Sequence, residues 1–465
     1  MKVLLAFAGS RGDAQPGVLL GRELQGRGHD VTVAVSPNLV EFASRHGVPA
    51  VPFGLDSDEL LRAQRDDRRF RHLNPFQRLR AIVDLQRRGF GESARDLVAA
   101  TRGHDIVVTG MACEEVAVEV ARHHHIPVAA VHFFPIRPNR SVPVVATGWG
   151  QRIPGPLNRL GWRALTAARA RALASEVAAL PAAPASFDPV GVPGAQGYTA
   201  IQAYDPELFP GLANELRDSP FTGFPVPDTT QYPDVEPEPV AFRRTAVIGA
   251  APGTSTGVSA GRHRNGVAYP AIQAYDSELF EWLIAGPAPV YAGFGSMPVA
   301  DPVAVEAMVR EAGRRLGLRV LLVGPMFRGR IGAELAVVDQ VDHRAVLPLC
   351  AAAVHHGGAG TTAAALRAGV PSVICSVQAD QPYWGRQVES LGLGATAPFA
   401  GLTANRLERL LIRATEPDVR LRAAAYGARF RDDGVRRAAD VVESLAPDTV
   451  ARDAAELSAA TIGGV

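Results

Sequence analysis

The chain has 465 residues, a length that suits roughly two or three domains, with two large ones the simplest arrangement. Apolar residues make up 47% of it, and 48 Lys and Arg against 47 Asp and Glu leave a net charge of +1, as in an ordinary globular protein. This balance provides no basic field for nucleic acid, and no apolar run is long enough to cross a bilayer.

The number and spacing of the cysteines indicate the redox conditions in which the protein works. Cys113, Cys350 and Cys375 are widely separated and form neither a CxxC pair nor the spacing of zinc ligands. This pattern favours a reducing cytosol over a disulfide framework. We therefore expect a cytoplasmic protein.

Short apolar runs alternate with helical patterns in the first part of the chain. The opening MKVLLAFAGSRGD is interpreted as a strand, because its apolar run is short for a signal peptide and is followed by Arg and Asp. The stretch PGVLLGRELQGRG predicts a helix that begins at Pro16 and ends at Gly26 or Gly28. The strands expected here cover residues 3–8, 31–35, 106–109 and 128–132.

A second alternating series begins at Pro289. Two such series predict an α/β protein with two doubly wound domains that face each other across a cleft, with ligands beyond the carboxyl ends of the strands. The strands expected in the second series are 290–294, 320–323, 337–339, 351–354 and 372–375, and the helices are 304–316, 361–368 and 406–414.

The middle of the chain has the composition of a linker. Residues 225–266 are rich in Pro, Gly, Thr and Asp and show little periodicity. AIQAYDPELF at 200–209 returns as AIQAYDSELF at 271–280, which indicates either a local duplication that lengthened this region or a second copy of a binding element. We expect an acceptor-binding domain at 1–225, a linker with an insertion at 226–285, a nucleotide-sugar domain at 286–445, and a tail at 446–465 that is flexible or packed back on the first domain.

Two charged stretches leave alternatives open. Residues 60–90 are rich in arginine, so they form either a solvated face with Arg–Asp pairs or a peripheral membrane contact without stable insertion. The run His123, His124 and His125 is typical of a solvated helix end, because consecutive helical residues cannot converge on one metal ion.

The segment AVHHGGAGTTAA, residues 353–364, joins an apolar strand to an apolar helix. Its glycines permit a sharp bend and let an anion approach the backbone, and the first N–H groups of a helix bind phosphate readily. A histidine before the turn and the Thr361 hydroxyl add donors. Without other evidence the segment is equally well a turn followed by a capped helix.

Other loops at strand ends carry polar residues. AFAGSRGDAQP at 6–16 and YAGFGSMP at 291–298 combine glycine with hydroxyl groups. SVQADQPYWGRQV places Asp380 and Gln381 just past a strand, where they can bind sugar hydroxyls, although Asp380 also suits a helix N-cap. His132 follows a strand end and is either an acceptor contact or a buried structural histidine.

The segment VDHRAVLPLCAAAVHHGGAGTTAAALRAGVPSVICSVQADQPYWGRQVESLGLG closely resembles the donor-binding region of the bacterial antibiotic and sterol-type UDP-glycosyltransferases, which have the GT-B fold. The opening MKVLLAFAGSRGDAQPGVLLGRELQGRGHDVTVAV resembles the start of the acceptor domain in that family. FTGFPV (221–226) and PVYAGFGSMP (289–298) fit its domain junction. The resemblance covers nearly the whole chain except about residues 235–276 and the extreme C-terminus.

The resemblance implies a role for each matching residue. Asp13 would be the general base, and Asp380 and Gln381 would bind the sugar hydroxyls. The segment around His343 would pack on the nucleobase. The other residues implied in donor binding, most of them around the diphosphate, are His356, Gly358, Gly360, Thr361, Ser296 and Ser10.

We therefore expect an inverting glycosyltransferase that moves a hexose, preferably glucose, from a UDP- or dTDP-sugar to a hydroxyl of a lipophilic natural product. No metal or other cofactor is expected, since a helix terminus and a histidine would stabilise the leaving diphosphate. Ala364 stands where many relatives carry a ribose-binding Glu, so UDP and dTDP both remain open. The alternatives are a sugar-nucleotide epimerase of similar fold and an inactive nucleotide-binding auxiliary protein.

Overall fold

The structure is a computed structural model that describes residues 1–67, 69, 75–146, 150–178, 197–227, 277–295, 299 and 301–445. The chain divides into two compact units, residues 1–232 with 431–465, and residues 233–430. The predicted linker core, the first six residues of the repeat's second copy, and the tail at 446–465 lie outside the described residues. Part of the arginine-rich stretch lies outside them too.

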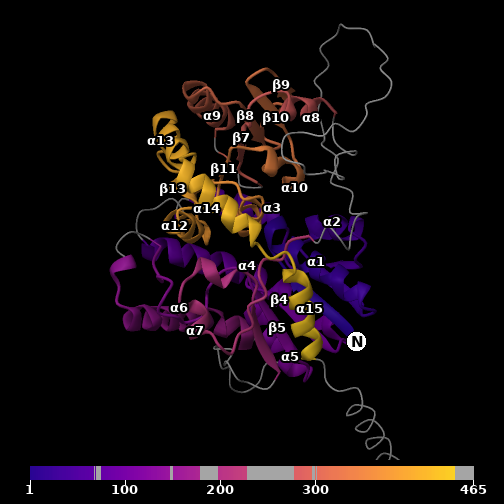
Figure 1. The fold of residues 1–465 in the computed structure, drawn as a ribbon. Coiled ribbons are helices and arrows are strands. Elements are labelled where there is room, and N and C mark those ends of the chain that lie inside the picture. Colours follow the sequence, from indigo (N-terminus) through magenta and orange to yellow (C-terminus); the bar gives the residue numbers. More distant parts are fainter. Residues whose placement is uncertain are drawn as a thin grey trace, which may run out of the picture. The chain divides into compact units, whose positions relative to one another are not determined.

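The first unit is built on a parallel sheet, of which β4 and β5 are labelled in Figure 1. Its described strands run in the order β3-β2-β1-β4-β5-β6. β1 lies between β2 and β4, with Val3 opposite both Val31 and Ile106. Chain order therefore reverses beside β1, the point at which sheets of this kind bind ligands. The strands are β1 (Lys2–Phe7), β2 (Asp30–Val35), β3 (Ala50–Pro52), β4 (Ile106–Gly110), β5 (Val128–His132) and β6 (Tyr198–Gln202).

Helices connect these strands, and the last one returns to this unit from the far end of the chain. The α-helices are α1 (Arg11–Gly26), α2 (Val40–Arg45), α3 (Ser57–Asp66), α4 (Pro75–Thr101), α5 (Glu114–His123), α6 (Gly155–Ala178), α7 (Leu212–Glu215) and α15 (Gly434–Ser444). Short 3₁₀ turns are η1 (Pro37–Leu39), η3 (Gly150–Arg152) and η4 (Pro206–Leu208).

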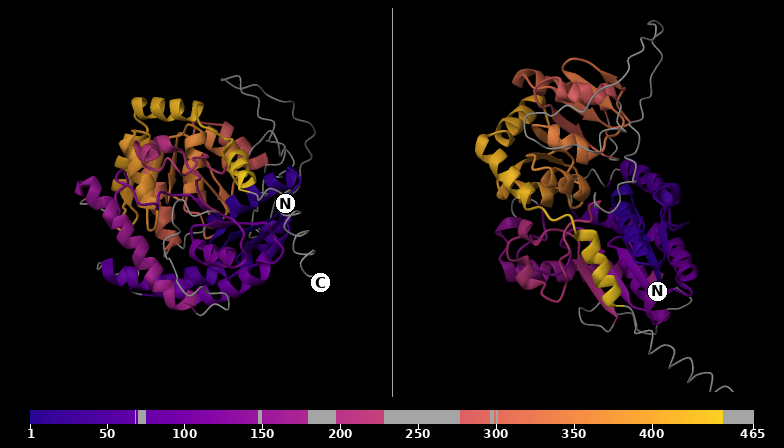
Figure 2. Two further views of the ribbon diagram at one scale, coloured as in Figure 1. Left: turned by 90° about the horizontal axis from the view of Figure 1, so that it is seen from below. Right: turned by 45° about the vertical axis from the view of Figure 1, so that its right-hand side comes forward.

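The helix α15 packs on α1 (Figure 2). Charged side chains connect the two segments. The Arg27 guanidinium contacts Asp440 and Glu443, each at 2.7 Å, and also Glu23 at 2.8 Å. His29 lies 2.8 Å from Glu443. The expected second domain ran to residue 445, whereas this division assigns α15 to the first unit.

The second unit contains a sheet in the order β13-β12-β11-β7-β8-β10-β9, parallel except for β9. β7 lies between β11 and β8, so chain order reverses between β7 and β11. The strands are β7 (Val290–Gly293), β8 (Val320–Val323), β9 (Arg330–Ile331), β10 (Leu335–Val338), β11 (Ala352–His355), β12 (Ser372–Ser376) and β13 (Gly394–Pro398).

The helices of the second unit follow the same alternation. They are α8 (Ser277–Ile284), α9 (Pro302–Leu316), α10 (His343–Val346), η6 (Leu347–Leu349), α11 (Ala359–Arg367), α12 (Gln381–Ser390), α13 (Ala404–Ala414) and α14 (Pro417–Ala428).

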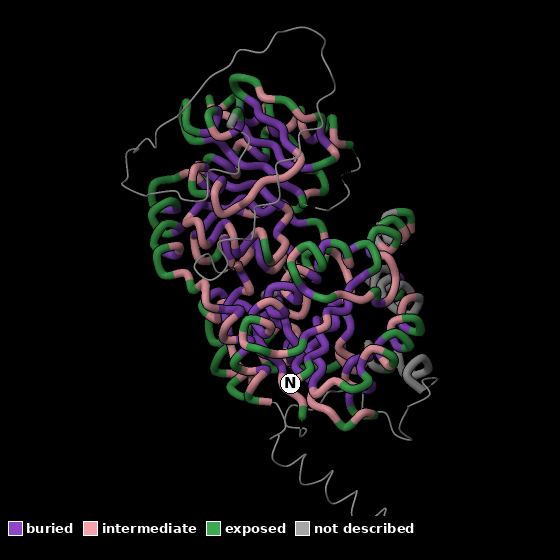
Figure 3. The backbone as a smooth tube through the Cα atoms, turned by 90° about the vertical axis from the view of Figure 1, so that its right-hand side faces the viewer, coloured by how far each residue is buried: buried purple, intermediate pink, exposed green. Residues whose placement is uncertain are grey.

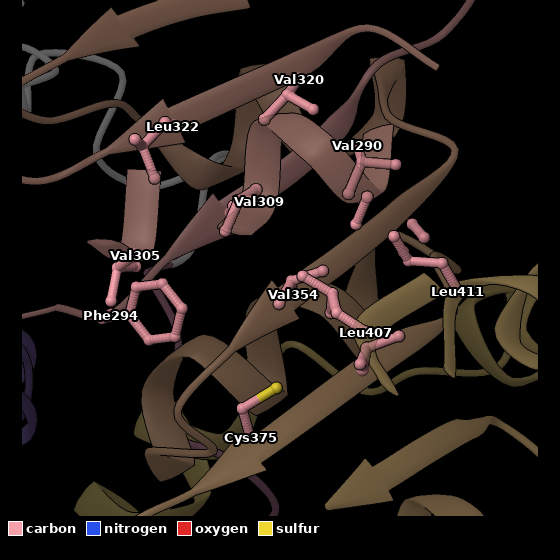
Figure 4. Close-up of a cluster of buried hydrophobic side chains, with 14 of the residues drawn as sticks. Val290, Phe294, Val305, Val309, Val320, Leu322, Val354, Cys375, Leu407 and Leu411 are labelled. Carbon is pink, nitrogen blue, oxygen red and sulfur yellow. The ribbon is translucent and has the colours of Figure 1, made fainter. Parts of the chain in front are cut away.

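Each sheet forms the buried centre of its unit (Figure 3). In the second unit, alternate residues of one strand enter different clusters: Val354 packs with Val290, Phe294 and Leu407, while Ala353 packs with the cluster on the opposite face (Figure 4). This alternation follows from the two-residue period of a strand, and burial on both faces explains the apolar runs in the sequence. No helix among the described residues is long and apolar enough to cross a membrane.

The expected pair of doubly wound parallel sheets is confirmed. The predicted start of the first helix was wrong. The helix α1 begins at Arg11, and Pro16 lies inside it. The Asp13 carboxylate accepts the N–H of the N-cap residue Ser10 and so stabilises an earlier start. Asp13 is consequently a residue of the first helical turn.

Candidate functional site

The loop after β1 holds Asp13 through short local contacts. The Ser10 backbone N–H and Oγ donate to Asp13 Oδ2 at 2.8 and 3.0 Å. Neither of these donors uses the second carboxylate oxygen, Oδ1. Asp13 is partly buried, and burial raises the pKa of its carboxyl against the opposing effect of the Ser10 hydrogen bonds. A carboxylate of raised pKa is a better proton acceptor.

Neighbouring strands fix the path of this loop. Gly9 has φ +128°, and a Cβ there would collide with the Asp13 carboxylate, so the position requires glycine. The hydroxyl of buried Ser36, just after β2, accepts the Gly9 N–H and lies 3.1 Å from the Gly9 carbonyl oxygen. Cys113 Sγ, after β4, accepts the Ala8 N–H at 3.3 Å. The loop is therefore held from both sides of the reversal point beside β1.

His132 belongs to a buried polar network. Its side chain has no exposed surface, its Nε2 lies 2.9 Å from Glu114, and its Nδ1 lies 3.4 Å from Gln202 Nε2. Arg137 and Tyr198 donate to the same Glu114 carboxylate at 2.8 and 2.5 Å. Of the two alternatives for His132, these surroundings match the buried structural histidine.

In the second unit, the turn between β11 and α11 lies at the reversal point of the sheet. The N-cap of α11 is Gly358, and no side chain caps the helix start. The first helical residues are Ala359, Gly360 and Thr361, whose N–H groups have no partner within the helix. Such a helix start carries partial positive charge and suits an anion.

His356 lies beside this helix start. A Cβ placed on Gly358 would be 2.6 Å from His356 Nε2, and one on Gly295, just after β7, would be 3.0 Å from its Cε1. The imidazole is therefore wedged between the two loops at the reversal point. Burial, with a smaller contribution from His343, lowers the pKa of His356 to about 4, so the ring is neutral near pH 7. Its Nδ1 has no hydrogen-bond partner among the described residues.

His343, the first residue of α10, lies near the same edge. Its Nε2 is 2.8 Å from the Tyr291 hydroxyl, and the two rings meet edge to face. Burial raises the pKa of Tyr291, so the phenol keeps its proton and can donate to the imidazole.

The loop between β12 and α12 contains Asp380 and Gln381. Asp380 is the N-cap of α12, and its Oδ2 accepts the Trp384 indole N–H at 2.8 Å. Gln381 Oε1 accepts the N–H groups of Val377 and Gln378 at 2.8 and 3.1 Å. Ala379, which lies between Gln378 and Asp380 in the chain, has φ +54°, a conformation that is uncommon outside glycine and clusters at functional sites.

The structure places most of the predicted donor residues of the second unit after the carboxyl ends of β10, β11 and β12. These are His343, His356, Gly358, Gly360, Thr361, Asp380 and Gln381. Ser296 lies outside the described residues. Ser10 and Asp13 lie at the start of α1 in the first unit, where the Ser10 hydroxyl donates a hydrogen bond to the Asp13 carboxylate. No sequence pattern assigned a role to His355, although it stands directly before His356 in the chain.

Comparison with family models gives a match in each half of the chain. Residues 3–131 match the glycosyltransferase family 28 N-terminal domain, and residues 328–450 match the erythromycin biosynthesis protein CIII-like C-terminal domain.

Individual proteins match over nearly the whole length. The chain is 35% identical to an uncharacterized glycosyltransferase of Mycobacterium tuberculosis, covering 96% of this chain and 99% of that protein. It is 30% identical to the vancomycin aglycone glucosyltransferase of Amycolatopsis orientalis, covering 99% and 100%. Among solved structures, the glycotransferase of kitacinnamycin aligns with a TM-score of 0.62 at 20% identity, covering 96% of this chain and 99% of that one.

Proposed function

Because this chain belongs to the antibiotic-type glycosyltransferases of the GT-B fold, we propose that it transfers a hexose from a nucleoside diphosphate sugar to a hydroxyl of a lipophilic natural product, with inversion. The proposed sugar is glucose, carried by UDP or dTDP. A glucosyltransferase acting on vancomycin aglycone among the relatives supports both the sugar and a large organic acceptor.

The observation that carries the proposal is the start of α11. A helix of nine residues begins at the reversal point of a parallel sheet, with glycine at its N-cap and a neutral imidazole against it. The amides of Ala359, Gly360 and Thr361 would bind the diphosphate, and His356 would donate one further hydrogen bond. These groups would stabilise the charge that develops on the leaving diphosphate without a metal ion.

We assign proton removal to Asp13. Attack on the anomeric carbon requires the acceptor hydroxyl to lose its proton, and a carboxylate of raised pKa is suited to take it. Ser10 occupies one oxygen of the carboxylate and orients it, so that Oδ1 would receive the proton.

We assign the sugar hydroxyls to the loop of Asp380 and Gln381. Because Gln381 Oε1 accepts two backbone N–H groups, its amide nitrogen is the group suited to donate to the sugar. The nucleobase would lie near His343. Ala364 offers no carboxylate for ribose hydroxyls, which leaves UDP and dTDP as parallel proposals.

The test has two stages. Calorimetry with UDP and dTDP measures nucleotide binding, and UDP-glucose, UDP-galactose and dTDP-glucose are then offered with pooled phenolic and macrolide acceptors, read by mass shift. We expect binding of at least one nucleotide and an acceptor mass gain of one hexose.

Two other outcomes would contradict transfer. An altered sugar nucleotide formed without an acceptor would indicate an epimerase. Nucleotide binding without turnover against the whole panel, unchanged in Asp13→Ala, would indicate an auxiliary protein.

A further inference from the structure

We propose that His355 is a positioning residue, which holds the turn before α11 in the shape that presents His356 and the first helical amides. The inference rests on the proposed function, because it concerns the same nucleotide site. It differs from that proposal in that His355 itself touches no ligand.

The side chain of His355 is sealed in the second unit. It is the last residue of β11, lies opposite Gly293 and Ile374 on the two neighbouring strands, and has no exposed surface. Burial, with smaller contributions from His356 and His343, lowers its pKa to about 3, so the ring is neutral. A fully buried ring cannot contact a donor sugar or a diphosphate from solution.

The imidazole of His355 is hydrogen-bonded to the turn. His355 Nδ1 accepts the N–H of Gly357 at 3.2 Å, which places the ring hydrogen on Nε2. Gly357 is buried with φ +91°, and a Cβ there would lie 2.6 Å from Ile374 Cγ2. Without His355, the Gly357 N–H would be a buried donor with no acceptor, which destabilises this conformation.

The turn sets the positions of the groups on both sides of Gly357. That residue separates His356, whose ring lies against Gly358, from the helix that begins at Ala359. A change in the Gly357 backbone therefore shifts the imidazole and the first amides together. The contact from His355 to the second residue after it is the same one that an asparagine makes in an Asx-turn.

This similarity gives a matched pair of variants. His355→Asn keeps an acceptor for the Gly357 N–H. His355→Leu introduces a side chain that branches at Cγ as asparagine does, but it offers no acceptor. If His355 acts only by filling space, the apolar leucine is equal or better in a buried site. If it positions the turn, asparagine is better for nucleotide binding even where leucine is more stable.

The first measurement is calorimetry of UDP and dTDP with the full chain. We expect His355→Leu to weaken nucleotide binding about tenfold, and His355→Asn to stay within about threefold of the unaltered protein. Val354→Ala is the control, because Val354 is the adjacent buried residue on the opposite face of β11. It should lower Tm and leave nucleotide affinity unchanged.

A second measurement needs no nucleotide. Amide hydrogen exchange of the peptide that covers 356–361 should be faster in His355→Leu than in His355→Asn. Equal exchange and equal affinity in the two variants, or tighter binding by His355→Leu, would overturn the positioning role. If the unaltered protein binds neither nucleotide, the proposed function fails, and the exchange data still decide the role of His355 in the turn.

Discussion

The turn after β1 in the first unit and the turn after β11 in the second both lead from a strand into a helix, but they differ in the residues at the helix start. α1 has Ser10 at its N-cap and Asp13 at the third helical position, and the carboxylate of Asp13 accepts the N-cap N–H. α11 has Gly358 at its N-cap and Thr361 at the third position, with no side-chain cap. One helix start therefore carries its own anion, and the other carries none.

The different chemical tasks that we propose for the two turns follow from this difference. The positive end of α1 is already paired with Asp13, whose carboxylate is held in one orientation while burial keeps its pKa raised. The positive end of α11 has no acidic residue in its first turn and has His356 beside it, so in our proposal it would bind the diphosphate. In the proposed function, the same motif would provide a base in one unit and an anion-binding site in the other, through different residues at two positions.

The largest expected effect comes from removing the proton acceptor in the turn after β1. Asp13→Asn keeps an oxygen that can accept from Ser10 but removes the proton acceptor, so transfer should slow roughly 10²–10⁴-fold. Turnover is measured with saturating sugar nucleotide and acceptor. Nucleotide affinity by calorimetry is the control and should not change. Near-normal turnover would place the base elsewhere.

An acidic residue at the third position of α11, as in α1, should abolish most binding of the sugar nucleotide. Thr361→Asp places a carboxylate at the third position of α11, where it would pair with the helix start and repel a diphosphate. We expect UDP affinity to fall by roughly tenfold to a hundredfold, while the unfolding midpoint stays level or rises. Thr361→Asn, neutral and of similar shape, is the matched control. Equal affinity for the two variants would show that this end does not face the diphosphate.

Removal of the imidazole should have a smaller effect. His356→Ala leaves the amides of α11 in place but deletes one donor, which should cost more than about 1 kcal/mol of UDP binding. His356→Gln, which keeps a donor on a shorter group, should recover part of that loss. Calorimetry that shows unchanged affinity for the alanine variant would remove His356 from the donor site.

The smallest expected effect is on pH dependence. Free His356, with a pKa of about 4, is neutral at pH 6–8, and a bound diphosphate would raise that pKa. Binding would then take up part of a proton, so UDP-glucose affinity should increase roughly threefold as pH falls from 8 to 6. Calorimetry in buffers of different ionisation enthalpy measures this uptake, and His356→Gln should lack it. Affinity that falls toward pH 6 would contradict the assignment.

Sequence periodicity predicted the strands well because they are buried. The runs at 128–132 and 320–323 coincide with β5 and β8. The strands β3, β6, β9 and β13 were not predicted. In β3 and β13, the sequences AVP and GATAP contain proline or glycine and lack an apolar run. The start of α1 was misplaced because Pro16 resembles a first helical residue, and only the side-chain contact of Asp13 with Ser10 reveals the earlier start.

The residues of the candidate site were proposed from the sequence, but their contacts could not be predicted from it. The glycines of HHGGAGTT and the strand before them indicate an anion-binding turn. No pattern indicates that Gln381 Oε1 accepts hydrogen bonds from the backbone N–H groups of Val377 and Gln378. Nor does any pattern indicate that His132 is buried and hydrogen-bonded to Glu114. These depend on residues that are distant in the sequence or on the conformation of a loop. The roles assigned to the site residues stay predictions until they are tested.

The return of α15 to the first unit constrains how members of this family can be recombined. A hybrid made with a single junction after residue 232 would leave the helix of one parent against the first helix of the other. The cluster of Arg27, His29, Asp440 and Glu443 would then have to match by chance. Exchange of the whole first unit between relatives therefore calls for two junctions, with residues 431–445 moved together with the first 232.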